Sequence, residues 1–131
     1  MEVKPINPWT WQDGFGFSQG IEVSGHQRTL ICSGQTSVDE NANPLHDGDV
    51  EAQLNKALDN LEAVLKQAGM TLSNVVRLNI YTTDVDGIMS GFGSYEARLK
   101  AAGCKPAATL LGVAKLFLPQ LLVELEATAV A

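Results

Sequence analysis

Basic residues are scarce in this chain. Lysine and arginine together number 9 against 15 aspartates and glutamates, which gives a net charge of −6. A protein that binds nucleic acid needs a basic face to displace counterions from phosphates, and here the basic residues are scattered along the sequence. The composition therefore argues against nucleic acid, and against an anionic membrane surface, as the main partner.

Cysteines, histidines and long apolar runs are also few. Cys32 and Cys104 cannot form a disulfide framework in a chain of 131 residues, so we interpret both as reduced and expect a cytoplasmic protein. No run of about 18 apolar residues predicts a membrane helix, and the first 14 residues lack the apolar region of a secretory signal. His26 and His46 have no metal-ligand spacing to other candidate ligands, so no metal site is predicted.

The sequence does contain enough apolar residues, 45%, for one domain over residues 1–131. Apolar residues recur at intervals of three and four from about residue 49 to 68, which predicts an amphipathic helix. Asp49 is its expected N-cap, and Gly69 is the expected glycine at its C-terminus. The run of β-branched residues over 75–82 predicts a strand.

The remaining segments have weaker patterns. Residues 17–23 and 28–35 predict two strands, joined as a hairpin by a turn at Gly25. A second helix is predicted from residue 84 or 85 to 102, where Gly87, Gly91 and Gly93 indicate close backbone approach or a frayed first half. Strands over 107–116 and 121–131 complete the chain.

This order, β-β-α-β-α-β-β, predicts an α/β protein with a mixed sheet. Right-handed crossovers place both helices on one face of that sheet. The other face then carries alternate residues of the last strand, including Leu122, Glu124 and Val130. A half-apolar sheet face without helices usually packs against another subunit, so the sequence predicts an oligomer.

Several segments resemble the RidA/YjgF family, also called endoribonuclease L-PSP, in order and spacing. They cover nearly the whole chain, from about residue 16 to 130, and read ICSGQTSVD, LDNLEAVLKQAGMTLSNVVRLNIYTTD, SYEARL, KPAATLLGVAKL and VELEATAV. The resemblance implies a chorismate-mutase-like fold and a homotrimer, in which the sheets form a central barrel with clefts between subunits. It also implies hydrolysis of 2-imino and enamine acids to 2-keto acids and ammonia, with no metal or organic cofactor.

The family's cleft residues can be carried over by position, and most are changed. Ala108 stands where the family has the arginine that grips the substrate carboxylate, and Thr109 keeps the Ser/Thr that follows it. Phe17 replaces the family's tyrosine, Phe92 an asparagine, and Leu110 a small polar residue or cysteine.

Two further features of the family's cleft are retained: the glutamate of the last strand, as Glu124, and the Ser-Gly turn, as Ser33 and Gly34. We predict that Phe17, Phe92, Ala108, Thr109 and Leu110 bind a ligand. Glu124 is the candidate acid or base, because desolvation in such a cleft raises a carboxyl pKa. Ser33 and Gly34 are candidate backbone donors, or alternatively a bulge that ends a strand.

Together, the replacements predict a drier cleft that suits a neutral or cationic, more apolar small molecule. Lys105 is a possible substitute for the missing arginine, and Glu124 with Glu126 are either a paired-carboxylate site or an interface pair. The aromatic residues of PWTWQDGFGF either line the cleft or pack in an interface. Three functions stay open. The first is an enzyme of this family that acts on a different substrate through Glu124, water and the Ser33–Gly34 backbone. The second is a trimeric ligand-binding or scaffold protein without turnover, and the third is a nuclease, which no basic patch or metal cluster supports.

Overall fold

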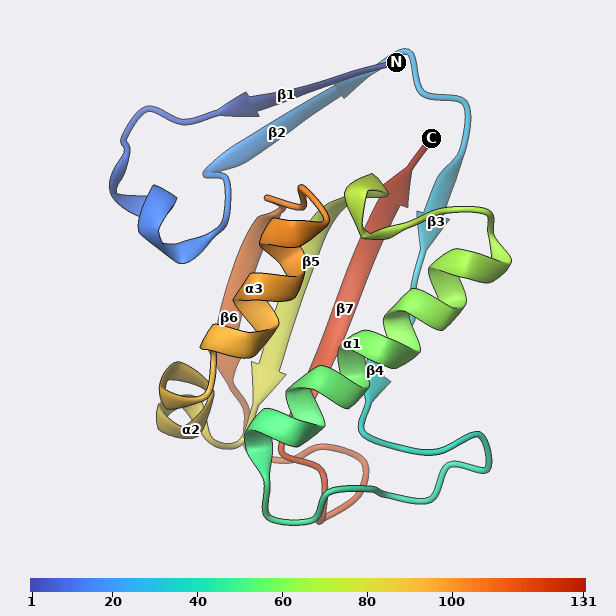
Figure 1. The fold of residues 1–131 in the computed structure, drawn as a ribbon, viewed down its shortest axis with the longest axis vertical. Helices are drawn as coiled ribbons and strands as arrows, with labels where there is room; N and C mark the ends of the chain where they lie inside the picture. The colour runs from blue at the N-terminus through green and yellow to red at the C-terminus, as the bar shows by residue number, and fades with distance from the viewer.

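The computed structural model describes residues 1–131. Figure 1 shows a sheet covered on one face by helices, with a separate two-stranded sheet beside it. The elements in chain order are β1 (Glu2–Ile6), η1 (Trp11–Phe15), β2 (Gly20–Ser24), β3 (Thr29–Ile31), β4 (Gln35–Thr36), α1 (Val50–Gln67), η2 (Leu72–Asn74), β5 (Val75–Thr82), α2 (Val85–Ser90), α3 (Gly93–Ala101), β6 (Ala107–Gly112) and β7 (Val123–Val130). None of the helices is long and apolar enough to cross a membrane.

Helix α1 confirms the strongest local prediction. The Asp49 carboxylate caps it by accepting a hydrogen bond from the backbone N–H of Ala52 at 3.0 Å. Gly69 follows the helix with φ +73°, a left-handed conformation that glycine adopts without strain. The apolar stripe of the helix is fully buried against the sheet: Leu54, Ala57, Leu58, Leu61 and Leu65.

The sheet has the order β3-β7-β5-β6, with β4 also paired to β7. Strands β5 and β6 are parallel and joined through α2 and α3, and β7 is antiparallel to β3, β4 and β5. Helices α1 and α3 lie on the same face of the sheet, as predicted (Figure 1). Inward-facing residues of β5 and β7, among them Leu78, Val123 and Leu125, join the helices in one apolar core.

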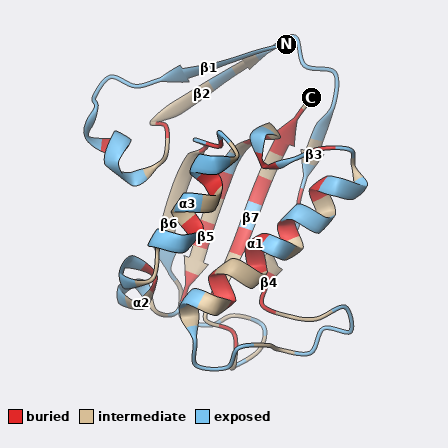
Figure 2. Cartoon of the chain, viewed as in Figure 1, coloured by how far each residue is buried: buried red, intermediate tan, exposed pale blue.

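Residues that alternate with these point to the other face, which no helix covers. Along β7, Val123, Leu125 and Ala127 are buried while Glu126 is exposed, and Figure 2 shows buried and more exposed positions alternating along this strand. The helix-free face predicted from the sequence is therefore present in the single chain. Its polar members are described with the candidate site.

The predicted hairpin of residues 17–23 and 28–35 is wrong. Gly25 does adopt φ +67° in a turn, but β2 turns away from β3 and pairs with β1 instead. Strand β3 pairs with β7 at the opposite end of the chain. Strand β1, which contains Pro5 and is exposed along its whole length, was not predicted from the sequence.

The predicted second helix is two helices. Helix α2 ends at Ser90 and α3 begins at Gly93, with Gly91 and Phe92 between them. A side chain at Gly87 would overlap the Asp84 carboxylate and lie 2.9 Å from Val50, so this glycine is needed for close approach. At Gly91 a Cβ would lie 3.0 Å from that of Glu51. The glycines therefore let α2 pack closely on the start of α1, as one of the two readings of the sequence supposed.

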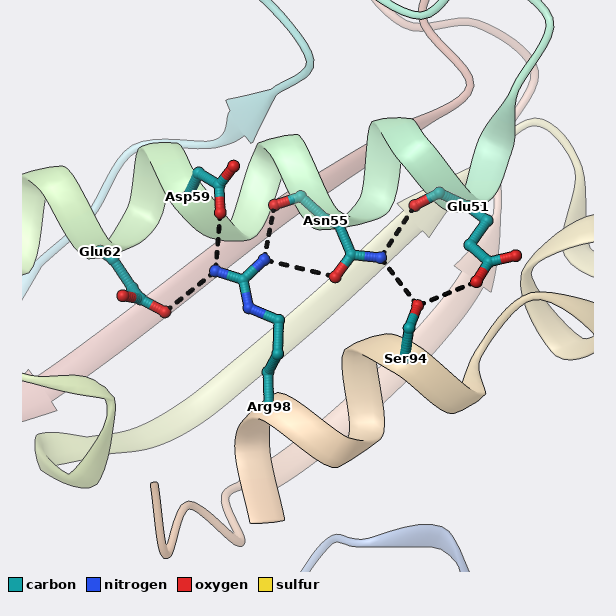
Figure 3. A network of polar contacts seen from close by, with 6 residues as sticks. All are labelled: Glu51, Asn55, Asp59, Glu62, Ser94 and Arg98. Atoms are coloured by element: carbon teal, nitrogen blue, oxygen red, sulfur yellow. Dashed lines mark hydrogen bonds and ion pairs between the residues drawn. The ribbon is translucent and has the colours of Figure 1, made fainter. Parts of the chain in front are cut away.

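Arg98 joins α3 to α1 on the outer side of the helical layer (Figure 3). Its guanidinium donates to the Asn55 carbonyl at 3.0 Å and forms ion pairs with Asp59 at 2.7 Å and Glu62 at 3.1 Å. Ser94 extends the network by bonding both Asn55 and Glu51. These contacts fix how α3 lies on α1, and thereby place the side chains that α3 directs toward the sheet.

Gln53 is a fully buried polar residue on α1. Its amide nitrogen donates to the carbonyls of His46 at 3.1 Å and Gln120 at 2.9 Å, and its oxygen accepts from the backbone N–H of Leu122 at 2.8 Å. One side chain thus satisfies three backbone groups from two loops. The loop before α1 and the loop between β6 and β7 are held together at this point.

Candidate functional site

A pocket of about 270 Å³ opens on the helix side of the sheet, between α2–α3, strands β5 and β6, and the segment before β2. Its walls are mostly apolar. The lining residues are Phe15, Gly16, Phe17, Leu78, Ile80, Met89, Phe92, Tyr95, Glu96, Leu99, Pro106, Ala108, Thr109 and Leu110. All five predicted ligand-binding residues, Phe17, Phe92, Ala108, Thr109 and Leu110, are among them.

Ser18 anchors the pocket wall formed by the segment before β2. Its backbone N–H donates to the Pro106 carbonyl at 3.0 Å, and its hydroxyl donates to the Lys105 carbonyl at 2.7 Å. These bonds tie the chain next to Phe17 to the start of β6. The Phe17 ring packs edge-on against Trp11 at a centroid distance of 5.8 Å, so the aromatic run contributes to the pocket wall.

Strand parity decides which residues of β6 face the pocket. Ala108 pairs with Leu78, and Leu110 with Ile80, and both partners are buried on the helix side. Ala108 and Leu110 therefore point toward the pocket. Thr109 borders the pocket, but its hydroxyl accepts a hydrogen bond from Arg77 at 2.7 Å on the helix-free face.

Helix α3 supplies the remaining wall and two polar side chains. Phe92 and Tyr95 pack with ring centroids 5.0 Å apart. The Tyr95 hydroxyl is buried without a hydrogen-bond partner, and burial raises its pKa far above the ordinary value, so it stays protonated. Glu96 is half-buried, and its Oε1 and Cγ would each lie 3.3 Å from a Cβ built on Gly16.

The retained acidic residue lies elsewhere. Glu124 pairs with Tyr81 across the strands, and both point to the helix-free face. Its carboxylate lies so close to Gly34 that a Cβ there would overlap it. Burial, and secondarily the charge of Glu126, raise the pKa of Glu124, which is the direction expected for a candidate acid or base.

Glu126 has the opposite tendency. Its Oε1 accepts hydrogen bonds from Asn79 at 3.1 Å and from the Tyr81 hydroxyl at 2.9 Å, and these two bonds lower its pKa. The two carboxyls of β7 therefore differ: Glu126 is held as the anion, whereas the proton binds more readily to Glu124. The difference makes a symmetric paired-carboxylate site less suited to this face than a single titrating Glu124.

The predicted site residues thus form two groups. Phe17, Phe92, Ala108 and Leu110 meet in the pocket, while Glu124, Ser33 and Gly34 gather on the opposite face of the same sheet. Because the sheet separates them, one chain does not bring them together. Lys105, the possible substitute for the arginine, is exposed and lines an adjoining pocket with Lys100, and not the apolar one.

Several pocket residues were not predicted from the sequence, and Glu96 is chemically the most relevant of them. It follows Tyr95 in the sequence, and Tyr95 is buried in the core. A charged residue next to a buried position of a helix is usually exposed to solvent, so the sequence pattern gave no signal that Glu96 lines a pocket. No group of three or more His, Cys, Asp or Glu side chains is placed to hold a metal ion.

Comparison with known proteins agrees with this fold. The model of the family described as endoribonuclease L-PSP matches residues 14–131. A 2-iminobutanoate/2-iminopropanoate deaminase from Mus musculus is 35% identical over 117 residues, which cover 87% of this chain and 80% of that protein. A RutC family protein from Aquifex aeolicus is 34% identical over 114 residues, 87% of each chain.

Solved structures give the same result. A protein of unknown function of the Rid family from Yersinia pestis, YyfB, superposes over 100% of both chains with a TM-score of 0.85 and 36% identity. The YjgF gene product of Escherichia coli matches 87% of each chain with a TM-score of 0.69 and 28% identity. With a family model matched over nearly its whole length and a shared fold, this chain belongs to the RidA/YjgF (endoribonuclease L-PSP) family.

Proposed function

We propose that this protein acts on a small, mostly apolar imine in a cleft between subunits, and that 2-imino acids are poor substrates. The observation that carries the proposal is Ala108, which faces an apolar pocket at the position where family resemblance implies a carboxylate-binding arginine. No lysine or arginine lines this pocket. A substrate carboxylate would therefore lose its hydration there without gaining a cation.

The proposed reaction is hydrolysis. Water adds to the C=N carbon, the nitrogen takes up protons, and the C–N bond breaks to give a carbonyl compound and ammonia. The adding water needs a group that removes a proton, and a carboxyl whose pKa is raised toward neutrality suits that role. Glu124 has this tendency, and the Ser33–Gly34 turn lies beside it.

The proposal requires a second copy of the chain. Glu124 and the pocket lie on opposite faces of the sheet, so Glu124 reaches a pocket only if that pocket belongs to a neighbouring subunit. The helix-free face and the exposed aromatic residues Trp9, Trp11 and Phe15 are surfaces that such an assembly would cover. We expect a homotrimer, as the family resemblance implies, and sedimentation equilibrium should give three times the 14.0 kDa chain mass.

A second candidate function is a binding or scaffold protein without turnover. It is favoured by the pocket itself, which one chain lines without any contribution from Glu124. Such a protein would bind the same apolar ligands but release no ammonia from an imine.

The test is a competition assay for imine hydrolysis. Threonine dehydratase generates 2-iminobutanoate in the cuvette, semicarbazide traps what is not hydrolysed, and the keto acid is followed. In parallel, a flavin amine oxidase generates the aldimine of benzylamine, which has no carboxylate, and benzaldehyde is followed against the same trap. We expect acceleration of the second reaction and little of the first.

Efficient hydrolysis of 2-iminobutanoate would overturn the substrate proposal. Absence of both activities, with an apolar ligand still bound, would favour the scaffold function. In the active case Glu124→Gln should lower the turnover of the aldimine, and unchanged turnover would remove Glu124 from the mechanism.

A further inference from the structure

Glu96 is the only charged side chain that lines the apolar pocket. It lies on the first turn of α3, directly after the buried Tyr95. The surrounding walls come from apolar groups such as Phe17, Phe92 and Leu110. The pocket therefore has one charged group, and its charge is negative.

This carboxylate has no partner within the chain. The two ion pairs of the structure both belong to Arg98, and no side-chain hydrogen bond involves Glu96. The nearest candidates, Lys100 and Lys105, line the adjoining pocket with it but lie more than 4.0 Å from its oxygens, since neither forms an ion pair. A carboxylate only accepts hydrogen bonds, so its free oxygens favour a ligand that donates them, above all a cationic nitrogen.

The size of the pocket limits the ligand. A volume of about 270 Å³ corresponds to about nine water molecules at about 30 Å³ each. This is room for one small ring with a short side chain. Burial of that ring against the apolar walls is favourable, and the carboxylate can form a charge-assisted hydrogen bond with an ammonium or iminium group at the end of the side chain.

The geometry points to one class of ligand: a small hydrophobic amine or protonated imine without a carboxylate, with its nitrogen at Glu96 and its apolar body against Phe17, Phe92 and Leu110. This inference rests on the proposed function, because it names the charge that the apolar ligand of that pocket carries. The family resemblance implies a positively charged arginine in this pocket, whereas the charged side chain present here is the negative Glu96. The ligand charge is reversed accordingly, from anion to cation.

Calorimetric titration of the whole protein at pH 7 with three matched compounds tests the inference. Phenethylamine carries the cation, 2-phenylethanol is its neutral counterpart, and 3-phenylpropanoate carries an anion. We expect the amine to bind at least about tenfold more tightly than the alcohol, the lower end of what a hydrogen bond to a charged group gives, because Glu96 is only half-buried. The propanoate should bind most weakly.

Three variants connect that preference to one residue. Glu96→Gln should remove the advantage of the amine while leaving the alcohol affinity unchanged, and the retained alcohol binding shows that the variant is folded. Glu40→Gln, in an exposed loop, removes the same charge from the chain and should leave the preference intact, which excludes a general effect of the negative net charge. Lys100→Gln should tighten amine binding, because it removes the cation one turn away from Glu96.

The outcomes separate this inference from the proposed function. Equal binding of amine and alcohol, or a preference that survives Glu96→Gln, would overturn the inference while leaving an apolar binding pocket. Tightest binding of the propanoate would overturn both the ligand charge and the proposed loss of carboxylate recognition. Binding of none of the three would overturn both proposals.

Discussion

Placing an arginine at position 108 should restore recognition of a substrate carboxylate. Ala108 faces the pocket beside Leu78, so the side chain of Ala108→Arg would extend along the wall where the family resemblance implies the guanidinium. A guanidinium makes charge-assisted hydrogen bonds to a carboxylate, each contributing about 1.5–3 kcal/mol. One such bond corresponds to about 10–150-fold in affinity, and we expect the lower end because Glu96 lines the same pocket and competes for the new cation.

The assay is the rate of 2-iminobutanoate hydrolysis in competition with semicarbazide, expressed as kcat/KM. Ala108→Arg should raise this value about tenfold over the wild type, and the double variant with Glu96→Gln should raise it further. Ala108→Met, which adds length without charge, should give no increase. Ala108→Lys, which adds charge without the planar fork, should give a smaller one.

Two results would refute the reasoning. A wild type that already hydrolyses 2-iminobutanoate as fast as the arginine variant would show that another group holds the carboxylate. Equal gains from arginine and methionine would show that pocket shape, and not charge, limits the reaction.

Three further predictions follow from the structure. Gln53→Leu should lower the free energy of unfolding, measured in urea, by about 3 kcal/mol, because three backbone groups lose their hydrogen-bond partner. As a control, Gln67→Leu at an exposed position should lower it by less than about 0.5 kcal/mol. Glu124→Gln should slightly raise the free energy of unfolding at pH 7 but not at pH 4. Because the pKa of Glu124 is raised in the folded state, the folded state binds the proton more tightly than the unfolded state does. The stabilisation from this bound proton is present below the ordinary pKa of a glutamate and is lost as the pH rises above the pKa of the folded state. Cys104, whose pKa burial raises to about 11, should react with a disulfide reagent at neutral pH only after unfolding in guanidinium; rapid reaction of the native protein would contradict its burial.

The elements predicted most closely are those whose signals are local. Helix α1 has an N-cap, an apolar stripe and a terminal glycine within one segment, and strand β5 has a continuous β-branched run. Both were predicted to within one residue of their ends. Each pattern depends on contacts that any compact core would satisfy, so the prediction needed no knowledge of partners.

The hairpin failed because strand pairing is not local. A turn glycine such as Gly25 shows that the chain changes direction, but not which strand it then joins. Strand β3 gains its hydrogen bonds from β7, about 100 residues further along, and β2 gains its bonds from β1. The exposed strand β1, interrupted by Pro5, has no apolar alternation that would reveal it.

Strand pairing also explains why only part of the candidate site's geometry could be predicted. The positions of Phe17, Phe92, Ala108 and Leu110 came from the family resemblance, and the structure brings them together in one pocket. The face to which each belongs depends on the register between β5 and β6, which the sequence does not display. Once Leu78 is paired with Ala108, the pocket is fixed on the helix side.

The alternation of side chains along the strands also places the groups needed for the two candidate functions on opposite faces of the sheet. Glu124 alternates with core residues Val123 and Leu125, so it cannot turn toward the helix side without moving a buried strand by one residue, which would expose the core of β7. Binding of an apolar ligand therefore needs only one chain, whereas acid–base chemistry by Glu124 needs two. Any condition that separates the subunits should accordingly abolish hydrolysis and spare much of the binding at Glu96, and parallel loss of both would place the ligand, as well as the acid–base group, in the interface.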